Sequence, residues 1–247
     1  MRVEEYINKQ LRRRKLHFPL IDPDPGKNSI EKIRRIAEML EEFGSDAVLV
    51  GGSTGVEERS LDRAIAAIKK HFTKPVILYP GSAQGISRRA DGILFMSLLN
   101  SSDPLWISGM QAAGAPAAKK YKIEPLPMAY LIVEPGMKAG EVGKAKLLRK
   151  ADEAVSYALA AQYMGMRFVY LEAGSGAYKT VPDEMIRSVR KETDVKLIVG
   201  GGIRDAETAK QKLRAGADII VTGTVLEDSG AERIRSIVKA IHGFKSK

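Results

Sequence analysis

Eight short apolar segments recur along the chain, and longer amphipathic segments separate most of them. Continuous apolar runs of this kind are typical of parallel strands buried on both faces, with helices covering the sheet. The predicted strands are Leu16–Asp22, Asp46–Gly51, Pro75–Tyr79, Asp91–Met96, Leu126–Val133, Phe168–Leu171, Lys196–Val199 and Asp218–Val221. The predicted helices are Ser29–Gly44, Glu57–Phe72, one that begins at Asp103 and Pro104, Leu147–Met164, Asp183–Glu192, Ala206–Ala215 and Gly230–Ile241.

Eight such units in 247 residues match the size of one (β/α)8 barrel. We therefore expect residues 1–247 to form a single barrel domain, with a basic lead-in at 1–15 and a tail at 242–247. An open doubly wound sheet is the alternative. The closed barrel is favoured because it accounts for all eight units at this length.

Two connections depart from the regular pattern. Pro80–Ala90 is too short and too rich in Gly and Pro for a barrel helix, so we expect an irregular segment in place of the third helix. Glu134–Lys146 carries three Gly and follows the fifth strand. It is either a lid over the barrel mouth or an ordinary surface loop.

Composition excludes several classes of protein. The chain has no Cys, which excludes disulfides, thiolate catalysis and Cys-ligated metal sites, and its three His are scattered. No apolar run reaches the roughly 18 residues of a membrane span, and no leader-like segment begins the chain, so a cytoplasmic location is expected. The net charge of +10 suits either anionic small substrates or nucleic acid. Because the charge is dispersed and aromatic residues are sparse, no nucleic-acid partner is expected.

Glycine-rich turns follow the last three predicted strands, where barrels of this kind commonly bind phosphate. Such turns let backbone N–H groups approach an anion, and the next helix adds the positive end of its dipole. We interpret them as a phosphate cradle, although they can also serve only as tight turns. The turns are Glu172–Gly176, Gly200–Asp205 and Gly223–Thr224.

Three further side chains stand at predicted strand ends. Asp22 follows the first strand and Ser53 follows the second, and a single carboxylate with a hydroxyl suits Mg²⁺, which keeps water ligands and binds substrate phosphates. Asp22 can equally be a turn residue before Pro23, and Ser53 a helix cap. Glu172 ends the sixth strand and is a candidate to accept a proton from a substrate hydroxyl, or else a rim residue in a salt bridge.

The sequence resembles the geranylgeranylglyceryl phosphate synthase family, whose bacterial relatives make heptaprenylglyceryl phosphate. The resemblance covers residues 16–240 in the right order, and the acidic first segment looks more like the archaeal members. It rests on LIDPD at 20–24, VLVGGSTG at 48–55, LLNSSDPLWISGM at 98–110, AYLIVEPG at 129–136, YLEAGSG at 170–176, VGGGIRD at 199–205 and VTGT at 221–224.

The resemblance implies a modified (β/α)8 TIM barrel and a Mg²⁺-dependent prenyl transfer. The geranylgeranyl group would pass from geranylgeranyl diphosphate to the 3-hydroxyl of sn-glycerol 1-phosphate, forming the first ether bond of archaeal lipids. Asp22 and Ser53 match the metal positions, and Glu172 matches the glycerol-binding carboxylate. The positions implied for sn-glycerol 1-phosphate are Tyr170, Leu171, Glu172, Ala173, Gly174, Ser175, Gly176, Gly201, Gly202, Gly223 and Thr224.

Glu172 and Asp22 are thus the candidate catalytic residues. Family members are dimers or hexamers, so a homo-oligomer is expected, without stable membrane insertion. The prenyl chain needs an apolar groove, for which the candidates are Leu98, Leu99, Trp106, Leu126, Met128, Tyr130 and Ile132. Another prenyl chain length, or a different phosphate-binding barrel such as a sugar-phosphate isomerase, stays open as an alternative.

Overall fold

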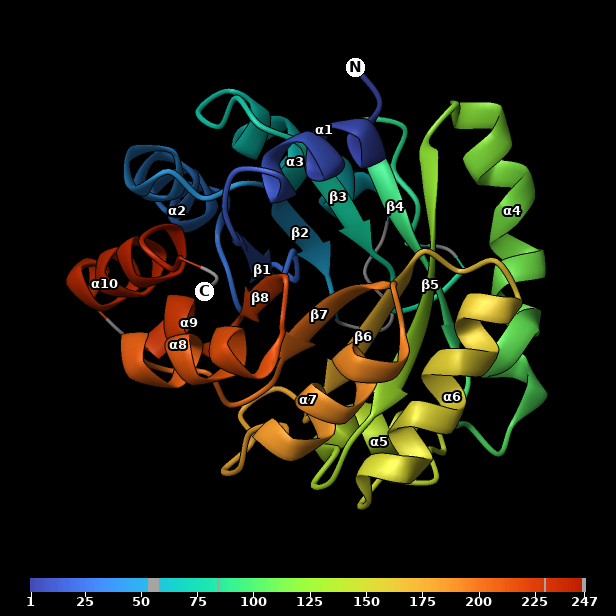
Figure 1. The fold of residues 1–247 in the computed structure, drawn as a ribbon. Helices are drawn as coiled ribbons and strands as arrows, with labels where there is room; N and C mark the ends of the chain where they lie inside the picture. Colours follow the sequence, from blue (N-terminus) through green and yellow to red (C-terminus); the bar gives the residue numbers. More distant parts are fainter. Residues whose placement is uncertain (53–57, 84, 229, 246–247) are drawn as a thin grey trace.

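In the computed structural model the eight strands form a closed parallel barrel in chain order, from β1 to β8, with β8 pairing back to β1 (Figure 1). The structure describes residues 1–52, 58–83, 85–228 and 230–245. The barrel topology is therefore as the sequence predicts. The strands are β1 Leu16–Ile21, β2 Val48–Gly51, β3 Val76–Tyr79, β4 Gly92–Leu98, β5 Glu124–Ile132, β6 Phe168–Glu172, β7 Lys196–Gly200 and β8 Ile219–Thr222.

Helices cover the outside of the barrel, and their ends follow local sequence signals. Ser29 begins α2 by accepting the Lys32 backbone N–H, and Gly44 ends it with a φ of 87°. Asp205 begins α8 by accepting the Thr208 N–H at 2.8 Å. The larger helices are α2 Ile30–Phe43, α3 Glu58–Lys69, α4 Met110–Tyr121, α6 Ala151–Tyr163, α7 Asp183–Glu192, α8 Ala206–Ala215 and α10 Ala231–His242.

The connection between β3 and β4 contains no helix among its described residues. The expectation of an irregular segment in place of the third helix is confirmed. Ile86 from this segment is buried and lines the cavity described below. The missing helix thus leaves room for the cavity on this side of the barrel.

Two segments contain short helices that the sequence analysis does not predict. The predicted lead-in contains a helix, α1 Val3–Leu11, which lies at the amino-terminal ends of the strands (Figure 1). Its buried Val3 and Ile7 join the barrel interior and close that end. The segment 134–146, expected to be either a lid or a surface loop, contains a short helix, α5 Met137–Val142, and part of it lines the cavity described below. Backbone hydrogen bonds from Lys146 to Asn100 and from Ser102 to Lys144 fix this segment to the end of β4.

A π-helical turn, η1 Leu105–Gly109, leads into α4 where the sequence predicts an ordinary helix start. Asp103 still caps this turn, since its carboxylate accepts the Leu105 N–H at 2.9 Å. A short helix, α9 Thr224–Asp228, follows β8. None of the helices in the described part of the chain is both long and apolar enough to cross a membrane.

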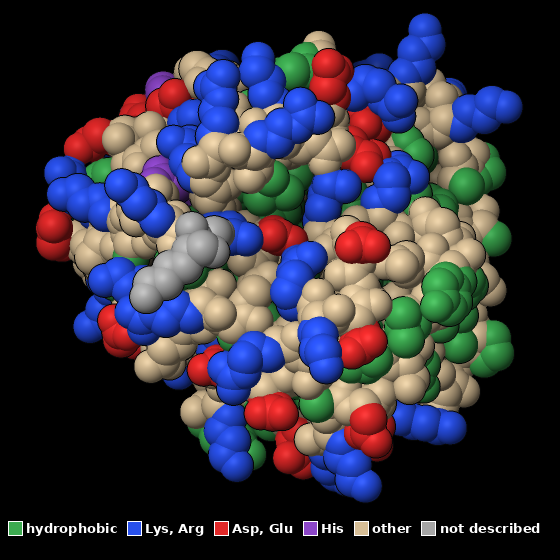
Figure 2. Space-filling view, in the orientation of Figure 1, with side chains coloured by type: hydrophobic (Ala, Val, Ile, Leu, Met, Phe, Trp, Pro, Cys, Tyr) green, Lys and Arg blue, Asp and Glu red, His purple; other side chains and the backbone are tan. Residues whose placement is uncertain are grey.

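The charged side chains are spread over the molecule. Figure 2 shows Lys and Arg interspersed with Asp and Glu across the visible face, without one continuous basic patch. Many of these charges are paired along helices, for example Arg34 with Glu31 and Glu38 on α2. The net positive charge is therefore mostly distributed over a solvated surface.

Candidate active site

One cavity of about 490 Å³ opens at the carboxyl ends of the strands. Asp22 after β1, Glu172 at the end of β6 and the glycine-rich turns after β6, β7 and β8 all line it. The lining includes Ser175, Gly176, Gly201, Gly202, Gly223 and Thr224. The structure thus brings most of the sequence-predicted site residues to one mouth, where barrel enzymes carry their chemistry.

Ser53, the second predicted metal position, lies outside the described residues. Leu171, Ala173 and Gly174 do not line the cavity, since their side chains or Cα atoms are buried behind it. Gly174 still contributes, because its backbone N–H donates to Glu172 Oε1 at 2.6 Å.

The turns form a cradle of neutral donors. The Gly176 N–H lies 3.2 Å from Thr224 Oγ1, and Ser175 Oγ lies 3.4 Å from the same oxygen, which ties the β6 turn to α9. Gly201 has a φ of +86°, and a Cβ there would lie 2.5 Å from Glu172 Oε1. Only glycine therefore lets the β7 turn approach the β6 turn this closely.

Arg204 lies at the rim of this cradle. Its Nη2 donates to the Gly176 carbonyl oxygen at 2.9 Å, and the side chain lines the cavity. The structure places the guanidinium at the edge of the predicted phosphate site.

Glu172 is buried with 6% of its surface exposed. Burial raises the pKa of its carboxyl above the usual range, while hydrogen bonds from Tyr170 and the Gly174 N–H partly oppose this rise. A buried carboxylate with a raised pKa is a stronger base than one in water. Glu172 is therefore suited to accept a proton from a hydroxyl held in the cradle.

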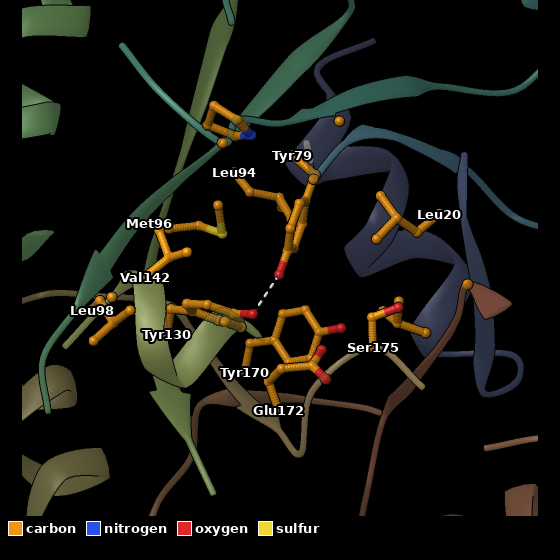
Figure 3. A pocket seen from close by; sticks show the side chains of 18 of the residues that line it. Leu20, Tyr79, Leu94, Met96, Leu98, Tyr130, Val142, Tyr170, Glu172 and Ser175 are labelled. Atoms are coloured by element: carbon orange, nitrogen blue, oxygen red, sulfur yellow. Dashed lines mark hydrogen bonds between the residues drawn. The ribbon is translucent and has the colours of Figure 1, made fainter. Parts of the chain in front are cut away.

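Three tyrosines separate the two sides of the cavity (Figure 3). The Tyr79 hydroxyl donates to the Tyr130 hydroxyl, with 2.5 Å between the two oxygens. The Tyr130 and Tyr170 rings lie edge to face, with 5.3 Å between their centroids. The strand register brings the Tyr130 and Tyr170 rings together, because the two residues pair on neighbouring strands and both side chains point into the barrel. In Figure 3, Glu172 and Ser175 lie on one side of the tyrosines, and Met96, Leu98 and Val142 on the other.

The second side of the cavity is an apolar arm, defined by Leu94, Met96, Leu98, Trp106, Met110 and Val142. Of the predicted groove residues, Leu98, Trp106 and Tyr130 line the cavity. Leu126, Met128 and Ile132 do not, because they fill the barrel interior, and Leu99 packs against the outer helical layer. The arm thus lies between β4, η1 and α5 instead of along β5.

Asp22 offers one carboxylate to a cation. The described residues contain no group of three or more His, Cys, Asp or Glu side chains placed to hold a metal. Asp24 turns its Oδ1 to the Gly26 N–H at 2.9 Å and does not line the cavity. A site with so few protein oxygens fits Mg²⁺, which retains water and binds substrate phosphates.

The sequence pattern that defines the PcrB family matches residues 9–241. The chain belongs to the PcrB family. Its relatives in that family include the geranylgeranylglyceryl phosphate synthase of Pyrococcus furiosus, 55% identical over 93% of this chain and 92% of that protein. That of Thermococcus gammatolerans is 58% identical over 93% of this chain and 91% of that protein.

A solved structure has the same fold over its full length. It is the (S)-3-O-geranylgeranylglyceryl phosphate synthase of Thermoplasma acidophilum in complex with its substrate sn-glycerol-1-phosphate. The two chains superpose with a TM-score of 0.95 at 46% identity, covering 99% of this chain and 100% of that one. The family resemblance on which the sequence analysis rested is confirmed.

Proposed function

We propose that this protein is a prenyltransferase that moves a geranylgeranyl group from geranylgeranyl diphosphate to the 3-hydroxyl of sn-glycerol 1-phosphate. The observation that carries the proposal is a single cavity with a glycine-lined anion cradle and Glu172 on one side and an apolar arm on the other. Relatives more than half identical to this chain are named for this activity. The Thermoplasma acidophilum relative binds sn-glycerol-1-phosphate as its substrate.

The acceptor is held at the cradle. Backbone N–H groups of the β7 turn and the hydroxyls of Ser175 and Thr224 receive its phosphate. The glycerol then extends towards Glu172, and the Tyr170 hydroxyl orients the carboxylate from the same strand face. This arrangement fixes the reacting hydroxyl before the donor arrives, which removes much of the entropic cost of the reaction.

The transfer exchanges one carbon–oxygen bond for another. The bond between the allylic carbon and the diphosphate oxygen breaks, and its electron pair leaves with the diphosphate. The acceptor oxygen forms the new bond to that carbon, and its proton passes to the Glu172 carboxylate. Burial around Glu172 and the tyrosines keeps water, the competing nucleophile, away from the allylic carbon.

The donor spans the rest of the cavity. Its chain lies in the apolar arm, and its diphosphate lies near Asp22, across the mouth from the cradle. Asp22, with Ser53 as the sequence suggests, would hold Mg²⁺, which stabilises the negative charge of a departing diphosphate. Asp22→Ala is expected to abolish Mg²⁺-dependent turnover while leaving the binding of sn-glycerol 1-phosphate largely intact.

A radiolabel assay tests the proposal. Purified protein receives labelled sn-glycerol 1-phosphate, Mg²⁺ and prenyl diphosphates of several lengths, and ether-linked product is extracted into organic solvent. We expect product with the C20 donor and a loss of product in Glu172→Ala. Absence of an ether product with every donor would refute the proposed function. A cytoplasmic location and assembly into a dimer or hexamer remain predictions.

A further inference from the structure

The Asp22 carboxylate already has a cationic partner. Lys27 Nζ lies 2.6 Å from Asp22 Oδ2, and the Asp24 N–H donates to Oδ1 at 3.1 Å. Both Asp22 and Lys27 line the cavity. The Asp22 side chain is 15% exposed and that of Lys27 is 52% exposed, so the ammonium can leave the carboxylate without crossing packed protein.

Backbone hydrogen bonds shape the turn that carries Lys27. The N–H groups of Lys27 and Asn28 donate to the Asp24 carbonyl oxygen at 3.0 and 2.9 Å. The Asn28 side-chain amide donates to the Asp22 carbonyl oxygen at 2.9 Å, and Asn28 is buried with 3% exposed. The turn therefore has hydrogen bonds that do not involve the Lys27 side chain.

A metal cation and the Lys27 ammonium compete for the Asp22 carboxylate. A cation bound through Oδ2 would repel the ammonium, which lies 2.6 Å from that oxygen. A prenyl diphosphate removes this conflict, because it carries more negative charge than one divalent cation neutralises. The displaced ammonium then has a new anionic partner beside its old one.

We propose that Lys27 is a catalytic residue that moves between two anions, pairing with Asp22 in the empty cavity and with the diphosphate of the prenyl donor in the loaded one. The inference rests on the proposed function and adds a residue and a binding order to it. Lys27 keeps its proton throughout and supplies charge to the leaving diphosphate as the allylic bond breaks. It also disfavours a cation at Asp22 until the diphosphate is present.

The other cationic side chains among the described lining residues have different places. Arg204 donates to the Gly176 carbonyl oxygen on the acceptor side, and Lys138 belongs to α5. Of these three lining cations in the described part of the chain, Lys27 forms the ion pair with Asp22. Lys138→Met is therefore a matched control, since it removes the same charge from another wall of the same cavity.

Two binding measurements on the full-length protein test the proposal. Mn²⁺ alone is titrated and its free form counted by electron paramagnetic resonance. Inorganic pyrophosphate is titrated at saturating Mg²⁺ and followed by the fluorescence of Trp106, the single tryptophan, which lines the cavity. In Lys27→Met we expect Mn²⁺ to bind several-fold more tightly. We expect pyrophosphate to bind about tenfold less tightly, because a charge-assisted hydrogen bond to the anion is lost.

Lys27→Arg is expected to restore pyrophosphate binding, and Lys138→Met to leave the Mn²⁺ affinity unchanged. Equal weakening of both ligands in Lys27→Met would mean that the ion pair only supports the turn. Tightening of both would mean that Lys27 only competes for Asp22. Unchanged pyrophosphate binding would also overturn the proposal.

Neither measurement requires turnover. If the wild-type protein makes no ether product, the proposed function fails, while the Mn²⁺ and pyrophosphate titrations still report on Lys27. If the protein makes ether product and Lys27→Met binds pyrophosphate normally, only the role of Lys27 fails. A thermal unfolding curve of each variant confirms that the compared proteins are folded.

Discussion

The carboxylate of Glu172 is buried beside Tyr170, and this placement sets the pH at which it can act. Burial raises its pKa, so the proton-accepting form is lost at a higher pH than for an exposed glutamate. Turnover is therefore expected to fall on acidification, with the acid limb above the usual range of a glutamate. A pH–rate profile measures this limb directly.

Glu172→Gln separates the chemical role from the binding role. The amide oxygen can still accept the Gly174 N–H but cannot take up the acceptor's proton. We expect turnover to fall by about 10²- to 10⁴-fold, as for loss of a general base, with a smaller change in the KM for sn-glycerol 1-phosphate. Glu172→Ala is expected to impair both. Full activity in Glu172→Gln would remove Glu172 from the chemistry.

A substitution of Arg204 tests whether the cradle binds sn-glycerol 1-phosphate. The hydrogen bond from Arg204 to the Gly176 carbonyl oxygen holds the turn that carries Ser175, whose hydroxyl is a proposed phosphate donor. Arg204→Met is expected to raise the KM for sn-glycerol 1-phosphate by about tenfold or more, with little change in turnover at saturation. Arg187→Met, an exposed position on α7 away from the cavity, is the control. An unchanged KM would show that the guanidinium serves neither the turn nor the phosphate.

Among the secondary-structure elements, the strands are the easiest to predict from the sequence. Each buried strand is a continuous apolar run, and the turns after β6 and β7 carry glycine where they approach neighbouring backbone, as at Gly174 and Gly201. The helix α1 was missed because only Val3 and Ile7 of its residues are buried, which is a weak periodic signal among charged neighbours. The order in 134–146 was missed because it comes from backbone hydrogen bonds to distant residues, which no local pattern encodes.

The apolar arm shows why the candidate site was only partly predictable. Alternation along β5 identifies its inward residues but not how high each stands in the barrel. Leu126 and Met128 therefore appeared equivalent to Tyr130, although they lie deeper in the packed interior. The contributions of Met96 and Val142 depend on how η1 and α5 pack over β4, and this tertiary arrangement has no sequence motif.

The arm also yields a prediction about product length. Leu98 lines the cavity at the end of β4, whereas Leu99 faces the outer helical layer. Leu98→Ala widens the arm, so we expect longer prenyl diphosphates to gain relative to the C20 donor. Leu99→Ala removes the same atoms without touching the cavity and is expected to lower stability but not to shift the ratio. Competition between donors of different length measures the ratio, and identical ratios in both variants would place the prenyl chain elsewhere.

One buried hydrogen-bond network connects the beginning and the end of the barrel. His17 on β1 is fully buried, with Nδ1 2.9 Å from Ser45 Oγ and Nε2 2.8 Å from Thr222 Oγ1. Asp46 accepts the His17 backbone N–H at 3.0 Å and lies 2.9 Å from His242 at the end of α10. The network therefore connects the first strand, the last strand and the last helix of the barrel.

This network predicts how stability depends on pH. Burial lowers the pKa of His17 from 6.5 to about 4, although the Asp46 charge opposes this. Between these values the unfolded chain binds a proton that the folded chain does not, so the free energy of unfolding falls as the pH drops from 6.5 to 4. The loss amounts to about 3 kcal/mol over this window. Burial alone would raise the pKa of Asp46, but the hydrogen bonds from His242, the His17 N–H and Arg14 outweigh burial and lower that pKa. Protonation of Asp46 in more acidic solution therefore removes further stability.

His17→Gln tests this dependence, because the amide can bond both hydroxyls but does not titrate. Denaturant unfolding at pH 7 and pH 4.5 is expected to show a smaller difference between the two conditions in His17→Gln than in the wild type. His71→Gln changes a half-buried histidine outside the network and should retain the wild-type difference. If His17→Gln also retained it, the acid sensitivity of the barrel would have to come from carboxylates such as Asp46 rather than from the histidine that Ser45 and Thr222 enclose.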